Sequence, residues 1–439
     1  MILRRTLSIL SLAAGILAAQ EPVPSLEFGF QERVRTEAWD NLVDHRDATP
    51  DLRSQIRFRT RLWAAVPLGP GLSLSAGLVN ENRKVTRPDQ ATNGREVAFE
   101  TLHLDWRLGS AWTLRAGRQA LMRGDGFVLW DGGALDGSRS AYLNALDLVW
   151  TGGSLKVEGL AILDPRKDRF LPRLNATDDP RERQLLNERD EAALGLYATW
   201  RREGRDLQAY AFHKTERRDV RALADPLFVP DRRVETLGLR LAETLGGGWE
   251  ATGELALQAG RQAGRPGTAE AASAIRAWGG QGRLTRAFAW ASKPALSLGW
   301  VGLSGDDPAT DAKEAWDPLF SRWPKWSELY VYSLVPEAGV ATWSNLRMYE
   351  ATAQGRPHAR LGLRGSLYWL RAFHPASGSP FAAGLGRGRL AELRADLELA
   401  EGWQGHILYE RLDPGTFYAG QDAGRFFRVE LQYTYRRRR

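Results

Sequence analysis

The chain has 439 residues, a formal net charge of +7, 43% hydrophobic residues and no cysteine. The lack of cysteine excludes a disulfide-stapled secreted module, a thiol enzyme, a cysteine metal site and a lipoprotein. Beyond residue 20, no apolar run approaches the roughly 20 residues that a membrane-spanning helix needs. Abundant glycine and tryptophan, with 45 Gly and 17 Trp but no such run, favour an all-β chain.

The first residues have the pattern of a secretory signal peptide. Arg4 and Arg5 precede an apolar stretch that ends in small residues, and Pro22 follows shortly after. A buried first helix is the alternative, but the charge, the length and the proline favour a signal peptide over residues 1–19. The remaining chain, 20–439, is then exported as a single domain.

The positive charge is concentrated at the two ends of the chain. Arg4 and Arg5 leave with the signal peptide, and Arg436–Arg439 form a run at the C-terminus. The body of the chain is therefore nearly neutral, so the high isoelectric point does not indicate a nucleic-acid partner.

Period-2 alternation predicts strands along the whole chain. In Gln55–Val66, Ile56, Phe58 and Leu62 fall on one face, and arginines fall on the other. Three successive inward arginines do not fit the dry core of a soluble sandwich, whereas a membrane barrel places them in a wet lumen. The predicted strands are 26–36, 53–66, 72–81, 96–108, 112–120, 141–150, 154–163, 190–201, 205–214, 233–242, 248–260, 274–288, 292–304, 344–354, 357–372, 388–400, 402–412 and 424–435.

The connections between these segments alternate between short and long. Short turns opposite long loops, such as 164–189 and 305–343, are typical of outer-membrane barrels, with the turns in the periplasm and the loops outside. We therefore expect a transmembrane antiparallel β-barrel of 18 strands in the outer membrane, and 16 strands remain an alternative. Tryptophans recur beside the short turns, as in an interfacial aromatic girdle, although packed core tryptophans would give the same count.

Several short stretches, in order, resemble the alginate-export family of outer-membrane barrels. They are Gly117-Arg118-Gln119, Gly124-Asp125-Gly126, Ser304-Gly305-Asp306, Trp316-Asp317-Pro318-Leu319-Phe320, Asn345-Leu346-Arg347 and Pro414-Gly415-Thr416-Phe417. The resemblance implies an 18-stranded barrel that exports an anionic polyuronate through an arginine-lined constriction, with a periplasmic scaffold as a partner.

The alternation assigns a set of arginines to the lumen as candidate pore-lining and substrate-binding residues. The planar guanidinium can bind both oxygens of a carboxylate and does not lose its charge, although arginine also lines lumens simply as a paired wall. Arg118 has the parity opposite to Arg115, so at most one of the two points cleanly inward. The candidates are Arg57, Arg59, Arg61, Arg107, Arg115, Arg240, Arg347, Arg364, Arg394 and Arg428.

No motif indicates catalysis, a metal or a cofactor. The six histidines are scattered without metal-ligand spacing, and Asp306, Asp307 and Asp311 fit a solvated acidic loop better than a calcium site. We expect a non-enzymatic channel for an anionic polysaccharide, and the alternative is a passive or oligosaccharide- or anion-selective uptake porin. A barrel enzyme or a surface adhesion protein is a more distant alternative. The expected partners are the polysaccharide, outer-membrane lipid and lipopolysaccharide, the barrel-assembly machinery and an export scaffold.

Overall fold

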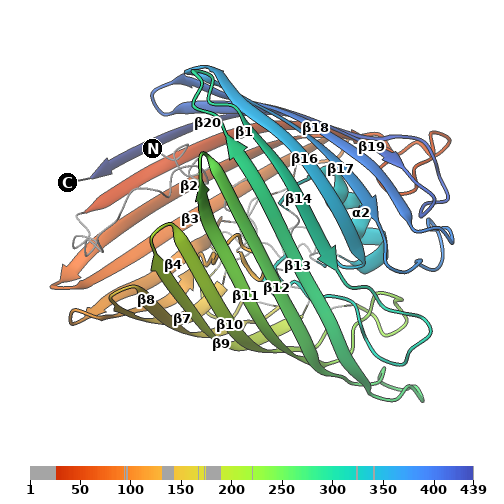
Figure 1. Cartoon of the computed structure of the whole chain (residues 1–439), viewed down its shortest axis with the longest axis horizontal. Helices are drawn as coiled ribbons and strands as arrows, with labels where there is room; N and C mark the ends of the chain where they lie inside the picture. The colour runs from red at the N-terminus through yellow and green to blue at the C-terminus, as the bar shows by residue number, and fades with distance from the viewer. Residues whose placement is uncertain are drawn as a thin grey trace.

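The computed structural model describes residues 26–92, 94, 97–130, 143–166, 168–172, 174, 189–219, 221–322, 325–339 and 342–438. Within these residues, 18 antiparallel strands form one sheet, and the sheet closes where β1 pairs with β20. Figure 1 shows the tilted strands wrapping around a central space. The predicted 18-stranded barrel is therefore confirmed, while the predicted signal peptide lies outside the described residues.

Each predicted segment corresponds to one barrel strand, with shifts at the ends. The strands are β1 (Glu27–Asp40), β2 (Arg53–Gly69), β3 (Leu72–Arg87), β4 (Val97–Leu108), β5 (Trp112–Gln119), β7 (Leu143–Gly152), β8 (Leu155–Asp164), β9 (Asp190–Arg202), β10 (Arg205–Arg217), β11 (Arg232–Gly246), β12 (Trp249–Gln262), β13 (Ser273–Ala287), β14 (Ala295–Leu303), β16 (Leu346–His358), β17 (Leu361–Arg371), β18 (Gly386–Ala400), β19 (Trp403–Pro414) and β20 (Gly424–Arg438).

The two faces of the wall differ in polarity, as β11 illustrates. Leu237 and Leu239 point outward and are 65% and 60% exposed, whereas Thr236 and Arg240 point inward and are buried. Successive side chains of a strand lie on opposite faces, so one strand supplies both a lipid-facing surface and a polar lumen. The exposed leucines form the apolar belt that acyl chains require.

Two of the long connections fold back into the barrel. One contains β6 (Leu129–Trp130), and the other contains β15 (Phe320–Ser321) and the helix α2 (Leu329–Ala338). β6 and β15 pair in parallel, which joins the two loops. α2 lies inside the barrel (Figure 1), where it contacts β19, β20 and Trp39 of β1. The sequence predicted 305–343 only as a long external loop, whereas most of its apolar side chains are buried inside the barrel. No helix of the described residues is long and apolar enough to cross a membrane.

Candidate functional site in the lumen

The first inward loop reaches the wall of the barrel through Gly124, Asp125 and Gly126. Both glycines have a left-handed backbone, with φ of 55° and 69°, and a Cβ on Gly124 would come within 2.8 Å of Arg240 Cδ. This close approach lets the Asp125 carboxylate accept two bonds from Arg240, at 3.0 Å from Nε and 2.9 Å from the terminal nitrogen. The loop is thus tied to β11 across the lumen.

The second inward loop is tied to the same side of the barrel by Asp317. Its backbone N–H donates to Gln258 Oε1 at 2.9 Å, and its carbonyl accepts from the same amide at 2.7 Å. Its carboxylate forms ion pairs with Arg232 and Lys214, and the Lys214 ammonium also donates to the Leu319 carbonyl at 2.9 Å. A buried carboxylate with these partners holds the loop at a fixed depth in the lumen.

The helix α2 is fixed at both ends by charged side chains from the wall. At its start, Glu410 accepts bonds from the Ser327 hydroxyl at 2.6 Å and from the backbone N–H of Leu329 at 2.9 Å. Near its end, Glu337 pairs with the fully buried Arg387 at 2.6 Å. The N–H groups at a helix start need such acceptors, so the wall determines where the helix begins.

One side of the lumen carries an excess of arginine. Away from the turn end, the described lumen-facing positions of β20, β1, β2 and β3 hold eight arginines and three glutamates. The glutamates are Glu37, Glu81 and Glu430. The arginines, which we call the basic arc, are Arg33, Arg35, Arg53, Arg57, Arg59, Arg61, Arg83 and Arg428.

Within the basic arc, the predicted residues Arg57, Arg59 and Arg61 alternate along β2, and we call them the ladder. They differ in how far solvent reaches their side chains. Arg57 bridges Glu37 and Glu81, both at 3.0 Å, and Arg61 pairs with Glu100 at 2.5 Å. Arg59 donates to Gln31 and is only 2% exposed, whereas Arg57 and Arg61 keep 13% and 26% of their side chains exposed. Arg57 and Arg61 are therefore the members of this ladder that a solute can reach.

The facing side of the lumen is richer in carboxylates. Among the described strand residues, β7 to β12 direct eight carboxylates and five cations inward. The cations are Lys156, Arg201, Lys214, Arg232 and Arg240. The carboxylates, which we call the acidic arc, are Asp147, Glu158, Asp164, Glu191, Asp206, Glu216, Glu250 and Glu254. Cations of the inward loops pair with many of these carboxylates, as Arg123 does with Asp147 and Arg322 with Asp164 and Glu191.

Lys325 lies on the second inward loop and faces the first. Its ammonium is 5.2 Å from the centre of the Trp130 ring, close to Gly126. The loops packed around the ammonium lower the pKa of Lys325 to about 8, with Asp125 and Glu254 partly offsetting that effect, while the residue as a whole stays exposed to the lumen. This lysine is therefore a titratable cation between the two loops.

The structure places the predicted arginines as follows. All face the lumen except Arg347, which shares the outer face of β16 with the exposed Tyr349 and stacks on Phe373 at 4.5 Å. The parity of that strand had been assigned wrongly, because Leu346 and Met348 are the inward residues and pack against the folded-in loop. The lumen-facing members are Arg57, Arg59, Arg61, Arg107, Arg115, Arg240, Arg364, Arg394 and Arg428.

Arg118 lies outside this lumen set. It has the outward parity, and it is buried because it pairs with Asp168, at 2.7 Å, and donates to Asn144. The expectation that at most one of Arg115 and Arg118 points inward agrees with this placement.

Some lumen residues were missed at the level of sequence. Arg33 and Arg35 alternate with Val34 as clearly as the ladder on β2 does, so the same period-2 signal could have found them. Asp125 and Lys325 could not have been found that way, because they lie on irregular loops whose path into the barrel has no sequence periodicity.

A closed 18-stranded barrel with an apolar outer belt and a charged lumen defines an outer-membrane β-barrel channel. The sequence matches no protein-family model and no curated protein.

Solved structures with the same fold include outer-membrane proteins of Pseudomonas aeruginosa. OccK5 (OpdH) is similar with a TM-score of 0.57 and 11% identity over 94% of this chain and 98% of that one. OpdK has a TM-score of 0.55 and 13% identity over 94% and 99%. OprD has a TM-score of 0.54 and 10% identity over 94% and 95%. At these identities the similarity shows the fold alone.

The resemblance to the alginate-export family is wrong. The structural similarity is to the OprD and Occ channels, and the short motifs that suggested alginate export have structural roles in this barrel. Gly124-Asp125-Gly126 forms a tight turn against β11, and Asp317 anchors the second inward loop. Turns and anchors of this kind recur in unrelated loops, so their order along the chain was a weak guide to family.

Proposed function

We propose that the protein is a passive uptake channel for small anionic solutes. The observation that carries the proposal is the basic arc, in which arginines outnumber glutamates on one side of a lumen occupied by two inward loops. Arginine is well suited to carboxylates because its planar fork donates two parallel bonds. OpdK and OprD, which share this fold, are outer-membrane proteins, and this supports a channel.

The ion pairs of the basic arc suit conduction better than tight binding. Arg57 and Arg61 are partly exposed and already paired with Glu37, Glu81 and Glu100, so an incoming carboxylate exchanges with an existing partner. Such exchange gives several sites of modest affinity, which a solute can enter and also leave. The channel so described requires no catalytic group and no cofactor.

The test is the ion selectivity of Arg57→Gln, Arg59→Gln and Arg61→Gln combined. The triple variant leaves the glutamates of the arc with fewer cationic partners, so the ratio of anion to cation permeability should fall at least about twofold. Reversal potentials in planar bilayers under a salt gradient measure this ratio, and low salt limits screening. Liposome swelling should be faster with small carboxylates than with neutral sugars of similar size.

The matched control replaces Arg371, Arg389 and Arg425, which lie on the outer face, with glutamine. It removes the same net charge and should leave the reversal potential unchanged. An unchanged reversal potential in the lumen triple variant, or equal swelling with neutral sugars, would contradict an anion-selective uptake channel.

A further inference from the structure

A row of arginines follows the outer face of the barrel at its loop end. Each of these arginines lies among the last four residues at the loop end of its strand. Every barrel strand from β10 to β20 supplies one, except β14. We call this row the outer arginine belt. It comprises Arg217, Arg233, Arg261, Arg276, Arg347, Arg371, Arg389, Arg411 and Arg425.

Neighbouring strands bring the belt residues together in pairs. Arg233 is directly opposite Arg261, and Arg347 is directly opposite Arg371. Arg411 is likewise opposite Arg425. Like charges in directly opposed positions destabilise a sheet unless an anion lies between or beside them.

The belt lacks the anionic partners that other arginines of the chain have. Within the described residues, Arg411 alone among its members forms an ion pair, with Asp413 at 2.8 Å. The nearby outward Glu235 is bound instead to His213 at 2.6 Å. Arginines of the lumen, by contrast, are mostly paired with carboxylates. Asp40, Asp190 and Asp413 lie directly opposite Arg425, Arg217 and Arg389 on the same face, so the positive charge of the belt is offset only in part.

The turn end of the barrel also has outward arginines, and their partners lie at the turns themselves. Arg205 pairs with Glu243, and Arg286 donates to the Gly247 carbonyl and lies over the Trp249 ring. At the loop end, by contrast, the outward arginines follow one another on neighbouring strands, so an anion that several of them share is to be sought on that side of the membrane.

The belt borders the apolar surface that contacts lipid. On β12, Arg261 is followed down the outer face by Ala259 and the exposed Leu257, and on β20 Arg425 is followed by the exposed Phe427. A lipid packed on these apolar residues would have its headgroup at the level of the arginines.

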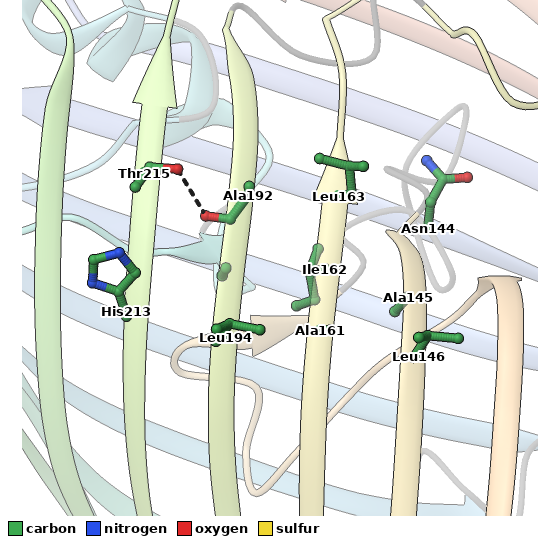
Figure 2. A pocket seen from close by; sticks show the side chains of 11 residues that line it. Asn144, Ala145, Leu146, Ala161, Ile162, Leu163, Ala192, Leu194, His213 and Thr215 are labelled. Atoms are coloured by element: carbon green, nitrogen blue, oxygen red, sulfur yellow. Dashed lines mark hydrogen bonds between the residues drawn. The ribbon is translucent and has the colours of Figure 1, made fainter.

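A groove for an acyl chain lies at one end of the belt. Figure 2 shows it on β7 to β10, where outward Leu146, Leu163 and Leu194 surround the small Ala161 and Ala192. The groove has a volume of about 490 Å³ and an almost wholly apolar lining. Thr215, at its edge, is two residues before Arg217 on the same face of β10, so a chain in the groove would bring its headgroup to the belt.

We propose that the outer arginine belt binds the phosphate groups of an acylated sugar lipid of the outer leaflet, with an acyl chain in the groove beside Arg217. Guanidinium and phosphate form bidentate, charge-assisted bonds, and a row across several strands can bind more than one phosphate. This site is separate from the lumen, so it does not depend on the proposed transport function.

The probe is a diphosphorylated, acylated disaccharide lipid, titrated against the full-length protein in detergent micelles. The test variant combines Arg217→Gln, Arg233→Gln, Arg261→Gln and Arg276→Gln. We expect its affinity to fall more than about tenfold, because each arginine near a membrane surface contributes to the attraction of anionic headgroups. Heat-modifiable migration on gels checks that the barrel is folded.

The matched control combines Arg202→Gln, Arg205→Gln, Arg286→Gln and Arg360→Gln at the turn end, which removes the same charge and should leave affinity within about twofold of wild type. Ala192→Phe, which fills the groove, should weaken binding although the belt is intact.

Unchanged affinity in the belt variant overturns the site, and unchanged affinity in Ala192→Phe overturns the acyl groove. Equal binding of the dephosphorylated lipid overturns phosphate recognition. Equal, belt-dependent binding of phosphatidylglycerol overturns the sugar-lipid assignment.

Discussion

Arginine has three different roles in this barrel, and its surroundings decide which one applies. Arg387 is fully buried and fixes α2 through Glu337, while Arg57 is partly exposed between two glutamates of the lumen. Arg261 on the outer face has no carboxylate partner among the described residues. Charge that is buried requires a partner, whereas charge at a water or headgroup interface does not.

Lys325 should make the channel sensitive to pH. Its pKa is lowered to about 8, so the ammonium is charged below that pH and becomes neutral as the pH rises through it. Loss of a cation between the inward loops should reduce anion selectivity between about pH 7 and pH 9. Reversal potentials measured across this range should show the transition.

Lys325→Gln is the variant that identifies the titrating group. It should have, at every pH, the reduced anion selectivity that wild type reaches only at high pH, with no transition near pH 8. If the variant keeps the same pH dependence as wild type, another group is responsible.

At the scale of single elements, the wall was predictable because each strand is constrained on both faces. Residues of β11 alternate between lipid and a polar lumen over its whole length, so the period-2 pattern has few interruptions. The helix α2 has no such constraint. Its residues acquire their burial from elements elsewhere in the chain, such as β19, β20 and Trp39 of β1, so the surrounding loop gave no regular pattern.

The lipid-facing position Leu239 offers a test of the wall. Replacing Leu239 with arginine places a charge near the middle of β11, facing acyl chains, and should cost ~2–4 kcal/mol of folding free energy. Urea titration of refolding into lipid vesicles measures the change. Leu223→Arg in the exposed loop is the control and should have little effect. Equal stability of Leu239→Arg and wild type would show that the face had been assigned wrongly.

At the scale of the whole molecule, the inward folding of the loops changes which segments of the chain are accessible from outside the cell. The sequence suggested that 164–189 and 305–343 would be exposed loops, and part of 164–189 lies outside the described residues. Residues 316–322 and 326–337 are mostly enclosed by the barrel, whereas the loop 263–272 is mostly exposed. The expected orientation places both at the external end.

Proteinase K added to intact cells should therefore cleave within 263–272 and spare 316–322 and 326–337. The turn at Glu203 and Gly204 should be cut only after the outer membrane has been permeabilised, because it is expected to face the periplasm. Fragment masses identify the sites. Cleavage at Gly204 in intact cells would invert the orientation.

The sequence by itself predicted the barrel, 18 strands with 16 as the alternative, and part of the set of lumen-facing arginines. These features follow from the alternation of apolar and polar side chains along each strand, which arises because lipid lies on one side of the strand and water on the other. It did not determine the family, since the short motifs around Asp125 and Asp317 are loop anchors that do not require one particular family.

Only the tertiary structure decided which arginines meet solvent, where the two loops enter the lumen and which arginines form the outer belt. These features depend on pairs such as Arg240 with Asp125 and Arg233 with Arg261, whose members come from different elements. Registry between strands and the path of a loop are set by packing across the whole barrel. That information is not contained in the pattern of any single segment.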